Sequence, residues 1–78
     1  MKVNVPFVKS VRITGEFIKL DSFLKHAGLV MTGGEAKVII ADGEVSVNGE
    51  KTTERGRKLR DGSIVSARGS LFRVVSDG

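Results

Sequence analysis

The sequence contains no cysteine, tryptophan or tyrosine, and it has one proline and one histidine. Without cysteine, disulfide bonds, cysteine nucleophiles and cysteine-based metal sites are excluded. A single histidine also excludes a multi-histidine zinc site. A chain of 78 residues buries only about 60% of its unfolded surface, so a large enclosed active-site cleft is not expected. These absences favour a binding protein over an enzyme, and we assign no catalytic or metal-ligating residue and no cofactor.

Long hydrophobic runs are also missing. No stretch approaches the roughly 20 apolar residues of a membrane span. The first residues, MKVNVPFVKSV, lack the apolar run and cleavage site of a signal peptide. We therefore expect a cytoplasmic protein with no membrane partner and no small-molecule substrate. The hydrophobic content of 40% predicts a folded chain rather than a disordered tail, with a single domain over residues 1–78.

Positive charge is concentrated in the carboxy-terminal part of the chain. Residues 1–50 hold six basic and six acidic residues, whereas residues 51–78 hold seven basic and three acidic ones, so the whole net charge of +4 lies there. Five of the basic residues fall in the segment KTTERGRKLR at positions 51–60. Such a cluster beside a neutral region is typical of a patch that binds a polyanion, although a solvated basic loop is the alternative.

Two short helices are expected. Leu20, Phe23, Leu24 and Ala27 recur at helical spacing after a lead-in over residues 16–19, with Gly28 as the stop. Thr32-Gly33-Gly34-Glu35 then matches a capping box, in which Thr32 accepts from the Glu35 amide and Glu35 accepts from the Thr32 amide. The apolar face of this second helix is expected to comprise Ala36, Ile39 and Ile40, with Lys37 pointing away and Gly43 ending the helix. Gly33 and Gly34 either form a tight turn, which the pair alone slightly favours, or leave room for a close approach to the backbone.

The remaining pattern predicts strands. Residues 5–13 are extended, and the first ten residues form either an additional strand or a frayed arm. Val45 and Val47 share one face of a hairpin whose turn is Asn48-Gly49, the preferred type I′ pair. After the basic loop and a turn at Asp61-Gly62, residues 63–67 and 71–75 form two strands. This order predicts an α+β fold, with two short helices packed on a small, mostly antiparallel sheet.

Five of these pieces in order resemble a known family. They are Lys19-Leu20-Asp21, Gly28, Thr32 with Ala36, the run Gly43 to Gly49, and Asp61-Gly62-Ser63-Ile64-Val65. The chain resembles the RNA-binding domain named after ribosomal small-subunit protein four over about residues 17–66, and looks most like its small stand-alone bacterial members. Many members carry Ser-Arg at the head of the second helix, where the arginine contacts RNA. Here Thr32-Gly33 stands in its place, so the backbone amides and Lys37 are expected to take over that contact. The usual Gly-Asp before the last strand is inverted to Asp61-Gly62, which we interpret as turn chemistry.

The resemblance implies a non-catalytic module that binds structured RNA, ribosomal or transfer RNA, through a basic surface and a helix amino terminus. The predicted RNA-binding residues are Lys19, Thr32, Gly33, Gly34 and Lys37 on one side of the surface and Lys51, Arg55, Arg57, Lys58 and Arg60 on the other. Phe23 is assigned to the core, as are Phe7, Phe17 and Phe72, so we expect recognition of phosphates and shape rather than base stacking on an aromatic platform.

Other polar residues have structural explanations. Asn48 is expected to serve the hairpin turn, His26 to be an exposed helical side chain, and Arg68 and Arg73 to lie outside the site. The main alternative function is a small basic adaptor that docks an acidic protein, for example at the ribosome. A small enzyme is the third hypothesis, but spacing suggests no nucleophile or carboxylate partner for His26.

Overall fold

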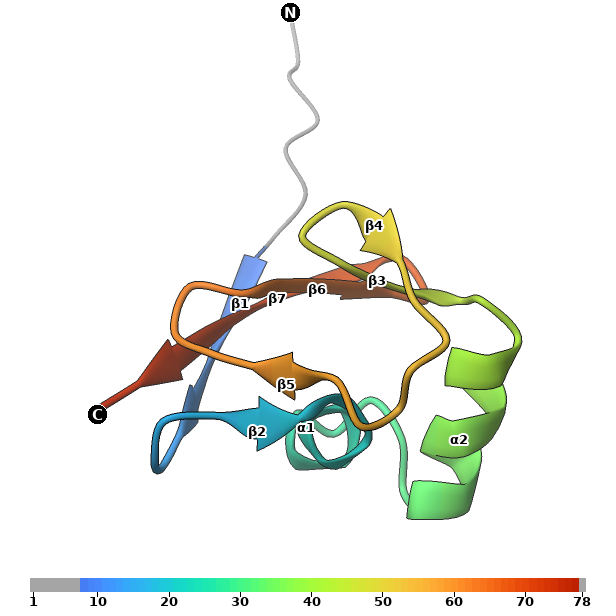
Figure 1. Ribbon diagram of the computed structural model, residues 1–78, viewed down its shortest axis with the longest axis horizontal. Coiled ribbons are helices and arrows are strands. Elements are labelled where there is room, and N and C mark those ends of the chain that lie inside the picture. Colours follow the sequence, from blue (N-terminus) through green and yellow to red (C-terminus); the bar gives the residue numbers. More distant parts are fainter. Residues whose placement is uncertain (1–7, 78) are drawn as a thin grey trace, which may run out of the picture.

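The structure is a computed structural model that describes residues 8–77. Two helices lie on one side of a five-stranded sheet, and a separate two-stranded ribbon lies beside α1 (Figure 1). This arrangement confirms the expected α+β fold. In chain order the elements are β1 (Val8–Ile13), β2 (Ile18–Lys19), α1 (Leu20–His26), α2 (Gly33–Ala41), β3 (Val45–Val47), β4 (Glu50–Lys51), β5 (Lys58–Leu59), β6 (Ile64–Ala67) and β7 (Ser70–Ser76).

The larger sheet has the strand order β1-β7-β6-β3-β4. All its neighbouring pairs are antiparallel except β1 and β7, which run parallel with Val8 opposite Leu71 and Ile13 opposite Ser76. The first described strand therefore lies against the last one. Residues 8–13 confirm part of the extended segment predicted over residues 5–13, whereas Pro6 and Phe7 lie outside the described residues.

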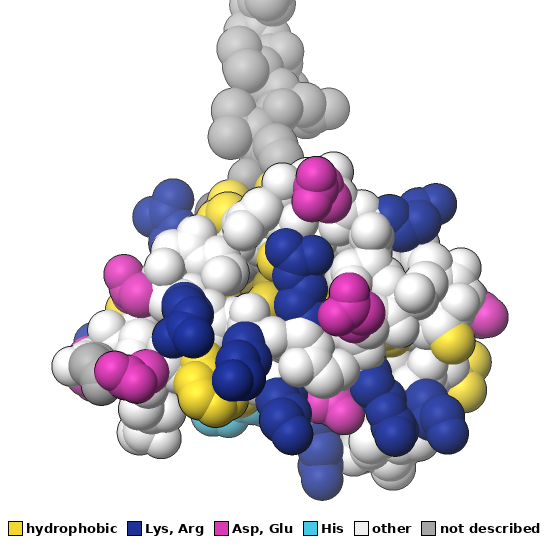
Figure 2. Space-filling view, in the orientation of Figure 1, with side chains coloured by type: hydrophobic (Ala, Val, Ile, Leu, Met, Phe, Trp, Pro, Cys, Tyr) yellow, Lys and Arg dark blue, Asp and Glu magenta, His cyan; other side chains and the backbone are white. Residues whose placement is uncertain are grey.

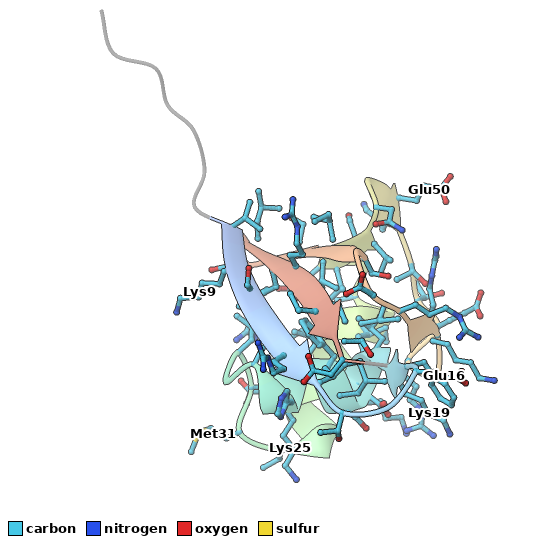
Figure 3. All side chains as sticks on the ribbon, turned by 90° about the vertical axis from the view of Figure 1, so that its left-hand side faces the viewer. Lys9, Glu16, Lys19, Lys25, Met31 and Glu50 are labelled. Carbon is cyan, nitrogen blue, oxygen red and sulfur yellow. The ribbon has the colours of Figure 1, made fainter. Side chains whose placement is uncertain are left out.

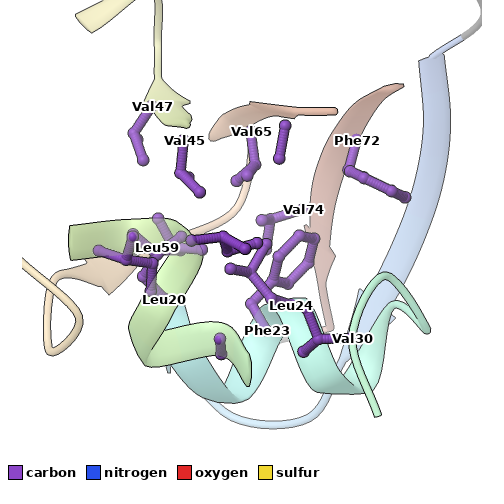
Figure 4. Close-up of a cluster of buried hydrophobic side chains, with 14 of the residues drawn as sticks. Leu20, Phe23, Leu24, Val30, Val45, Val47, Leu59, Val65, Phe72 and Val74 are labelled. Atoms are coloured by element: carbon purple, nitrogen blue, oxygen red, sulfur yellow. The ribbon is translucent and has the colours of Figure 1, made fainter. Parts of the chain in front are cut away.

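The core lies between the helices and the inner face of this sheet (Figure 4). Side chains alternate along a strand, so every second residue of β3, β6 and β7 points toward the helices. Phe23 of α1 meets Phe72 of β7 edge-to-face, with ring centroids 6.1 Å apart. The buried cluster comprises Ile13, Leu20, Phe23, Leu24, Val30, Ala36, Ile39, Ile40, Val45, Val47, Leu59, Val65, Ala67, Phe72 and Val74.

The helix boundaries follow the predicted caps with one difference. The hydroxyl of Thr32 accepts from the Glu35 amide at 3.1 Å, as expected. The return bond predicted for the Thr32 amide is wrong, because Glu35 Oε1 accepts from the amide of Met31 at 3.0 Å instead. The other oxygen of the same carboxylate faces Arg68 at 3.4 Å, which holds the side chain outside the geometry of the reciprocal box. Neither helix in the described part of the chain is long and apolar enough to cross a membrane.

Two-residue turns close both hairpins of the large sheet. Asn48 and Gly49 have positive φ values of 52° and 86°, which confirms the type I′ turn. The side chain of Asn48 also accepts from the Ile64 amide at 2.9 Å, and its own amide donates to the Ile64 carbonyl at 2.7 Å. Asn48 is therefore a structural residue, as its sequence context predicts. Arg68 and Gly69 adopt the same left-handed geometry between β6 and β7, with Ser70 already in β7.

The ribbon of β2 and β5 is absent from the sequence-based prediction. Ile18 pairs with Leu59, and Lys19 pairs with Lys58, in antiparallel register. Leu59 is completely buried and Ile18 packs against the core, so one face of the ribbon is anchored. The segment predicted as an open basic loop thus returns to the body of the protein at Leu59.

Candidate nucleic-acid interface

The basic segment is held in place by its backbone. Thr52, which is buried, donates its amide to the Val45 carbonyl at 3.0 Å, and its hydroxyl accepts from the Glu54 amide at 3.2 Å. The Arg57 amide closes a turn by donating to the Glu54 carbonyl at 3.2 Å. Because these bonds hold the backbone of the segment, its basic side chains start from fixed backbone positions rather than from a freely moving loop.

The start of α1 is capped by this same segment. The amide of Leu20 donates to the Arg57 carbonyl at 2.8 Å, and the amide of Asp21 donates to the Arg55 carbonyl at 3.0 Å. Lys19, the N-cap residue, makes no side-chain capping bond. The first amides of a helix have no partner within the helix, so these carbonyls satisfy them from outside. The contact fixes Arg55 and Arg57 beside Lys19.

The outer face of the ribbon carries Lys19 and Lys58, and Arg60 follows directly after the ribbon. Lys19 lies directly opposite Lys58 in the register, and both side chains are exposed. Like charges at opposite positions destabilise a strand pair unless an anion lies between or above them. Arg60 continues the strand direction beyond Leu59 and is also exposed. We call Lys19, Arg55, Arg57, Lys58 and Arg60 the cationic cluster.

Among residues 8–77, the cationic cluster forms no ion pair. The ion pairs found there join Arg12 to Asp77 at 3.5 Å, and Arg68 to Glu35 at 3.4 Å and to Glu44 at 3.8 Å. Lys and Arg side chains gather across the lower part of the face shown in Figure 2. Lys19 projects from this side of the molecule, whereas Lys9 projects from the opposite side (Figure 3). The cluster therefore presents unneutralised positive charge on one face.

Phe17 lies at the edge of the cationic cluster, and its assignment to the core is wrong. Its side chain is 39% exposed. The Lys58 ammonium lies 4.7 Å and the Arg60 guanidinium carbon 5.7 Å from the ring centroid. Alternation along the strand explains the position, because Ile18 points to the core and its neighbours Phe17 and Lys19 must point outward. The sequence pattern of residues 16–19 predicts only a lead-in to the helix and does not indicate this orientation.

The amino terminus of α2 is a separate part of the predicted site. Thr32, Gly33 and Gly34 are exposed there. A Cβ on Gly33 would meet nothing within 4 Å, one on Gly34 only the Thr32 hydroxyl at 3.8 Å, and neither has a positive φ. Turn geometry therefore does not require glycine at either position, and the backbone is open to a close approach. The Glu35 carboxylate also lies at this helix end, because it accepts from the Met31 amide.

Lys37 and Lys51 lie apart from the cationic cluster along α2. Lys37 is exposed in the middle of the helix. The stem of Lys51 crosses Gly43, where an added Cβ would stand 3.2 Å from the Lys51 Cδ. Gly43 follows the end of α2, so Lys51 marks the opposite end of this helix from Thr32. Nine residues of helix separate the two ends by about 13 Å.

An acidic groove borders the cluster near Arg60. This open cavity of about 380 Å³ is lined by Glu16, Arg60, Asp61, Ser76 and Asp77. Its carboxylates repel a polyanion, so they limit the basic surface on this side. Arg60 is therefore the member of the cluster that lines this groove together with carboxylates.

The remaining basic residues and the histidine have structural contacts or lie elsewhere. Arg68 joins the turn before β7 to Glu35 at the start of α2, so its side chain lies next to that part of the predicted site. Arg73 is exposed on β7 opposite Ile64 and Ser10. His26 is exposed on α1, as predicted, and its Nε2 lies 2.9 Å from the Arg12 carbonyl.

Comparisons with known proteins agree with this architecture. A family model described as the S4 domain matches residues 11–75. The Bacillus subtilis (strain 168) protein named "Probable ribosome maturation protein RlbA" is 42% identical over 67 residues, covering 85% of this chain and 94% of that protein. The Escherichia coli (strain K12) protein named "Putative RNA-binding protein YbcJ" is 36% identical over 59 residues, covering 76% of this chain and 84% of that protein.

A solved structure shows the same fold. The 30S ribosomal protein S4e from Thermoplasma acidophilum superimposes with a TM-score of 0.55 at 22% identity. The match covers 74% of this chain but only 30% of that protein, so it bears on the fold alone. The family resemblance expected from the ordered motifs is confirmed by the match over residues 11–75 and by relatives of similar length. The chain belongs to the S4 domain family.

Proposed function

We propose that this chain is a non-catalytic cytoplasmic protein that binds structured RNA, with ribosomal RNA as the first candidate and transfer RNA as the second. The observation that carries the proposal is the cationic cluster, whose charges are positioned by backbone bonds and have no carboxylate partner within residues 8–77. The names of the two relatives, one a ribosome maturation protein and the other an RNA-binding protein, support the same choice of partner.

The cations suit the chemistry of a folded RNA backbone. The guanidinium groups of Arg55 and Arg57 can each donate two parallel hydrogen bonds to one phosphate. Lys19 and Lys58 act as point charges, and their mutual repulsion is relieved when a phosphate lies between them. Lys37 and Lys51 extend the positive surface along α2 and contact the RNA only if it reaches beyond the cluster.

The amino terminus of α2 contributes a second contact in this proposal. Unpaired helix amides attract anions, and Gly33 and Gly34 leave space for a phosphate to approach them. Thr32 caps the helix at the same place, so its hydroxyl already has a structural role. Glu35 opposes the contact because its carboxylate stands at the same helix end. We therefore rank this contact below the cationic cluster.

The test is fluorescence anisotropy of a labelled RNA hairpin, a matched duplex and a single strand over a series of salt concentrations. If four or five phosphate contacts form, the logarithm of the affinity falls with the logarithm of the salt concentration with a slope of about −4. Replacing Arg55, Arg57 and Lys58 by alanine should reduce the magnitude of this slope by about 2–3. We also expect a preference for the hairpin.

A matched control removes three charges elsewhere. Lys9, Arg12 and Arg73 lie on β1 and β7 and are not members of the cationic cluster, and their replacement by alanine should leave the slope unchanged. Equal effects of the two triple variants would show that net charge alone drives binding and would remove the proposed site. Failure of the wild-type protein to bind any of the three RNAs at low salt would favour the alternative, an adaptor for an acidic protein.

A further inference from the structure

Phe17 stands out among the aromatic side chains. The described residues contain three phenylalanines, of which Phe23 and Phe72 are 0% and 4% exposed. Phe17 is 39% exposed and does not belong to the buried cluster. A partly exposed ring is unremarkable by itself. Its surroundings are what distinguish it.

Two cations lie over the ring. The Lys58 ammonium and the Arg60 guanidinium carbon lie 4.7 and 5.7 Å from the ring centroid, and Lys19 lies opposite Lys58 on the same ribbon. Figure 2 shows exposed hydrophobic surface directly beside Lys and Arg side chains on this face. An apolar π-face bordered by cations matches the two parts of a nucleotide, a flat base and a charged phosphate.

The backbone around the ring is fixed. Ile18 follows Phe17 directly, packs against the core and pairs with the buried Leu59. Two residues further along, the Leu20 amide bonds to the Arg57 carbonyl at 2.8 Å. The ring therefore projects from the residue directly before an anchored strand, which lowers the entropy lost when a ligand stacks on it.

We propose that Phe17 is the stacking site for one unpaired base of the RNA, with Lys58, Arg60 and Lys19 binding the phosphates on either side of that base. The inference rests on the proposed function and adds to it the class of RNA feature that is read, a bulged, looped or single-stranded nucleotide. On binding, the flexible Lys58 side chain exchanges its contact with the ring for a contact with phosphate, and the base takes the place that Lys58 leaves over the ring. Bases inside a duplex are already stacked, so they do not compete for the ring.

The first experiment uses a tryptophan at this position. The chain contains no tryptophan and no tyrosine, so Phe17→Trp introduces a single indole fluorophore. The probes are an adenine-containing single-stranded RNA of about eight nucleotides, within the usual site size for single strands, the same backbone without bases, and an RNA duplex. Stacking predicts strong quenching by the base-bearing strand and little by the other two. Equal quenching by the abasic strand would overturn the inference.

The second experiment measures affinity. Phe17→Leu keeps an apolar side chain but removes the π-face, and we expect its affinity for the base-bearing strand to fall by about fivefold to a hundredfold. Its affinities for the abasic strand and the duplex should change by less than about twofold, because their binding is electrostatic. Val38→Ala on α2, where Val38 is 58% exposed, is the matched control and should change none of the three. Far-UV circular dichroism checks that both variants remain folded.

The outcomes separate the two proposals. If Phe17→Leu binds all three RNAs as the wild type does while the triple cationic variant is weakened, the stacking site is wrong and the RNA-binding function stands. If Phe17→Leu weakens binding to all three RNAs equally, the ring supports the fold of the ribbon and does not stack on a base. If the wild type binds none of them, the proposed function fails and the inference fails with it.

Discussion

Replacing Glu35 by glutamine changes the charge at the amino terminus of α2, and its effect can be measured on both stability and RNA affinity. The Glu35 carboxylate accepts from the Met31 amide at 3.0 Å and lies 3.4 Å from Arg68, at the positive end of the helix dipole. A glutamine keeps a side-chain oxygen that can accept from the same amide, but it removes the charge. The variant should therefore be less stable and should bind RNA more tightly.

The loss of stability is small and has two sources. The Arg68 and Glu35 side chains are 42% and 38% exposed, so solvent screens their ion pair, which contributes about 0.2–1 kcal/mol. Loss of the favourable charge–dipole interaction adds about 0.3–1 kcal/mol. The sum of about 1 kcal/mol corresponds to a decrease in Tm of about 4–8 °C for a domain of this size.

The gain in RNA affinity depends on where the phosphate lies. Two unit charges 4 Å apart interact with about 1 kcal/mol in water, and the energy falls with distance and with salt. A phosphate at the amino terminus of α2 would therefore gain about twofold to fivefold in affinity at low salt when the carboxylate is removed. The gain should disappear as the salt concentration rises.

The assay pairs thermal denaturation with RNA anisotropy and includes Asp42→Asn as the control. Asp42 is exposed at the carboxy-terminal cap of the same helix, so its replacement removes the same charge from the opposite end. There the helix dipole disfavours an anion, so this control should be as stable as the wild type or slightly more so. Glu35→Gln with unchanged or weaker RNA affinity would refute the proposed phosphate contact at Thr32, Gly33 and Gly34.

Two further predictions concern the scaffold of the site. Leu59→Ala should lower the free energy of unfolding by about 2–5 kcal/mol, because Leu59 is fully buried. Urea denaturation measures this loss. A change below about 1 kcal/mol would mean that the ribbon is not anchored by this side chain. Asn48→Ala should cost about 2 kcal/mol in the same assay, because alanine disfavours the φ of 52° and cannot accept from the Ile64 amide at 2.9 Å. Asn48→Gly keeps the backbone geometry and should lose less, and equal losses in the two variants would assign the whole effect to the hydrogen bond.

Local signals in the sequence were sufficient for much of the fold. The spacing of Leu20, Phe23 and Leu24 and the caps around Thr32 and Gly43 depend on residues within a few positions of one another, and the structure confirms both helices. The Asn48-Gly49 turn is likewise determined by its own two residues. Sequence patterns are reliable where the interactions that stabilise an element lie inside that element.

Long-range pairing explains what sequence reasoning missed. β2 and β5 contain two residues each, too few to show alternation, and they exist because Ile18 meets Leu59 across the fold. Phe17 was assigned to the core for the same reason, since its outward orientation follows only from a strand that no local pattern indicates. The basic segment at positions 51–60 was visible as charge, but its division between the cationic cluster and Lys51 depends on the path of the backbone.

The parallel pairing of β1 with β7 has a consequence for biosynthesis. β1 is the first described strand to be made and β7 the last, yet each residue from Val8 to Ile13 has its partner between Leu71 and Ser76. The first amides of α1 likewise have no partners until Arg55 and Arg57, whose carbonyls accept from them, have been synthesised. Contacts so distant in sequence slow folding, because a long loop must close before they form. A nascent chain that ends before Ser70 therefore leaves β1 without its neighbour, and we expect the domain to reach its final form only when translation of β7 is complete.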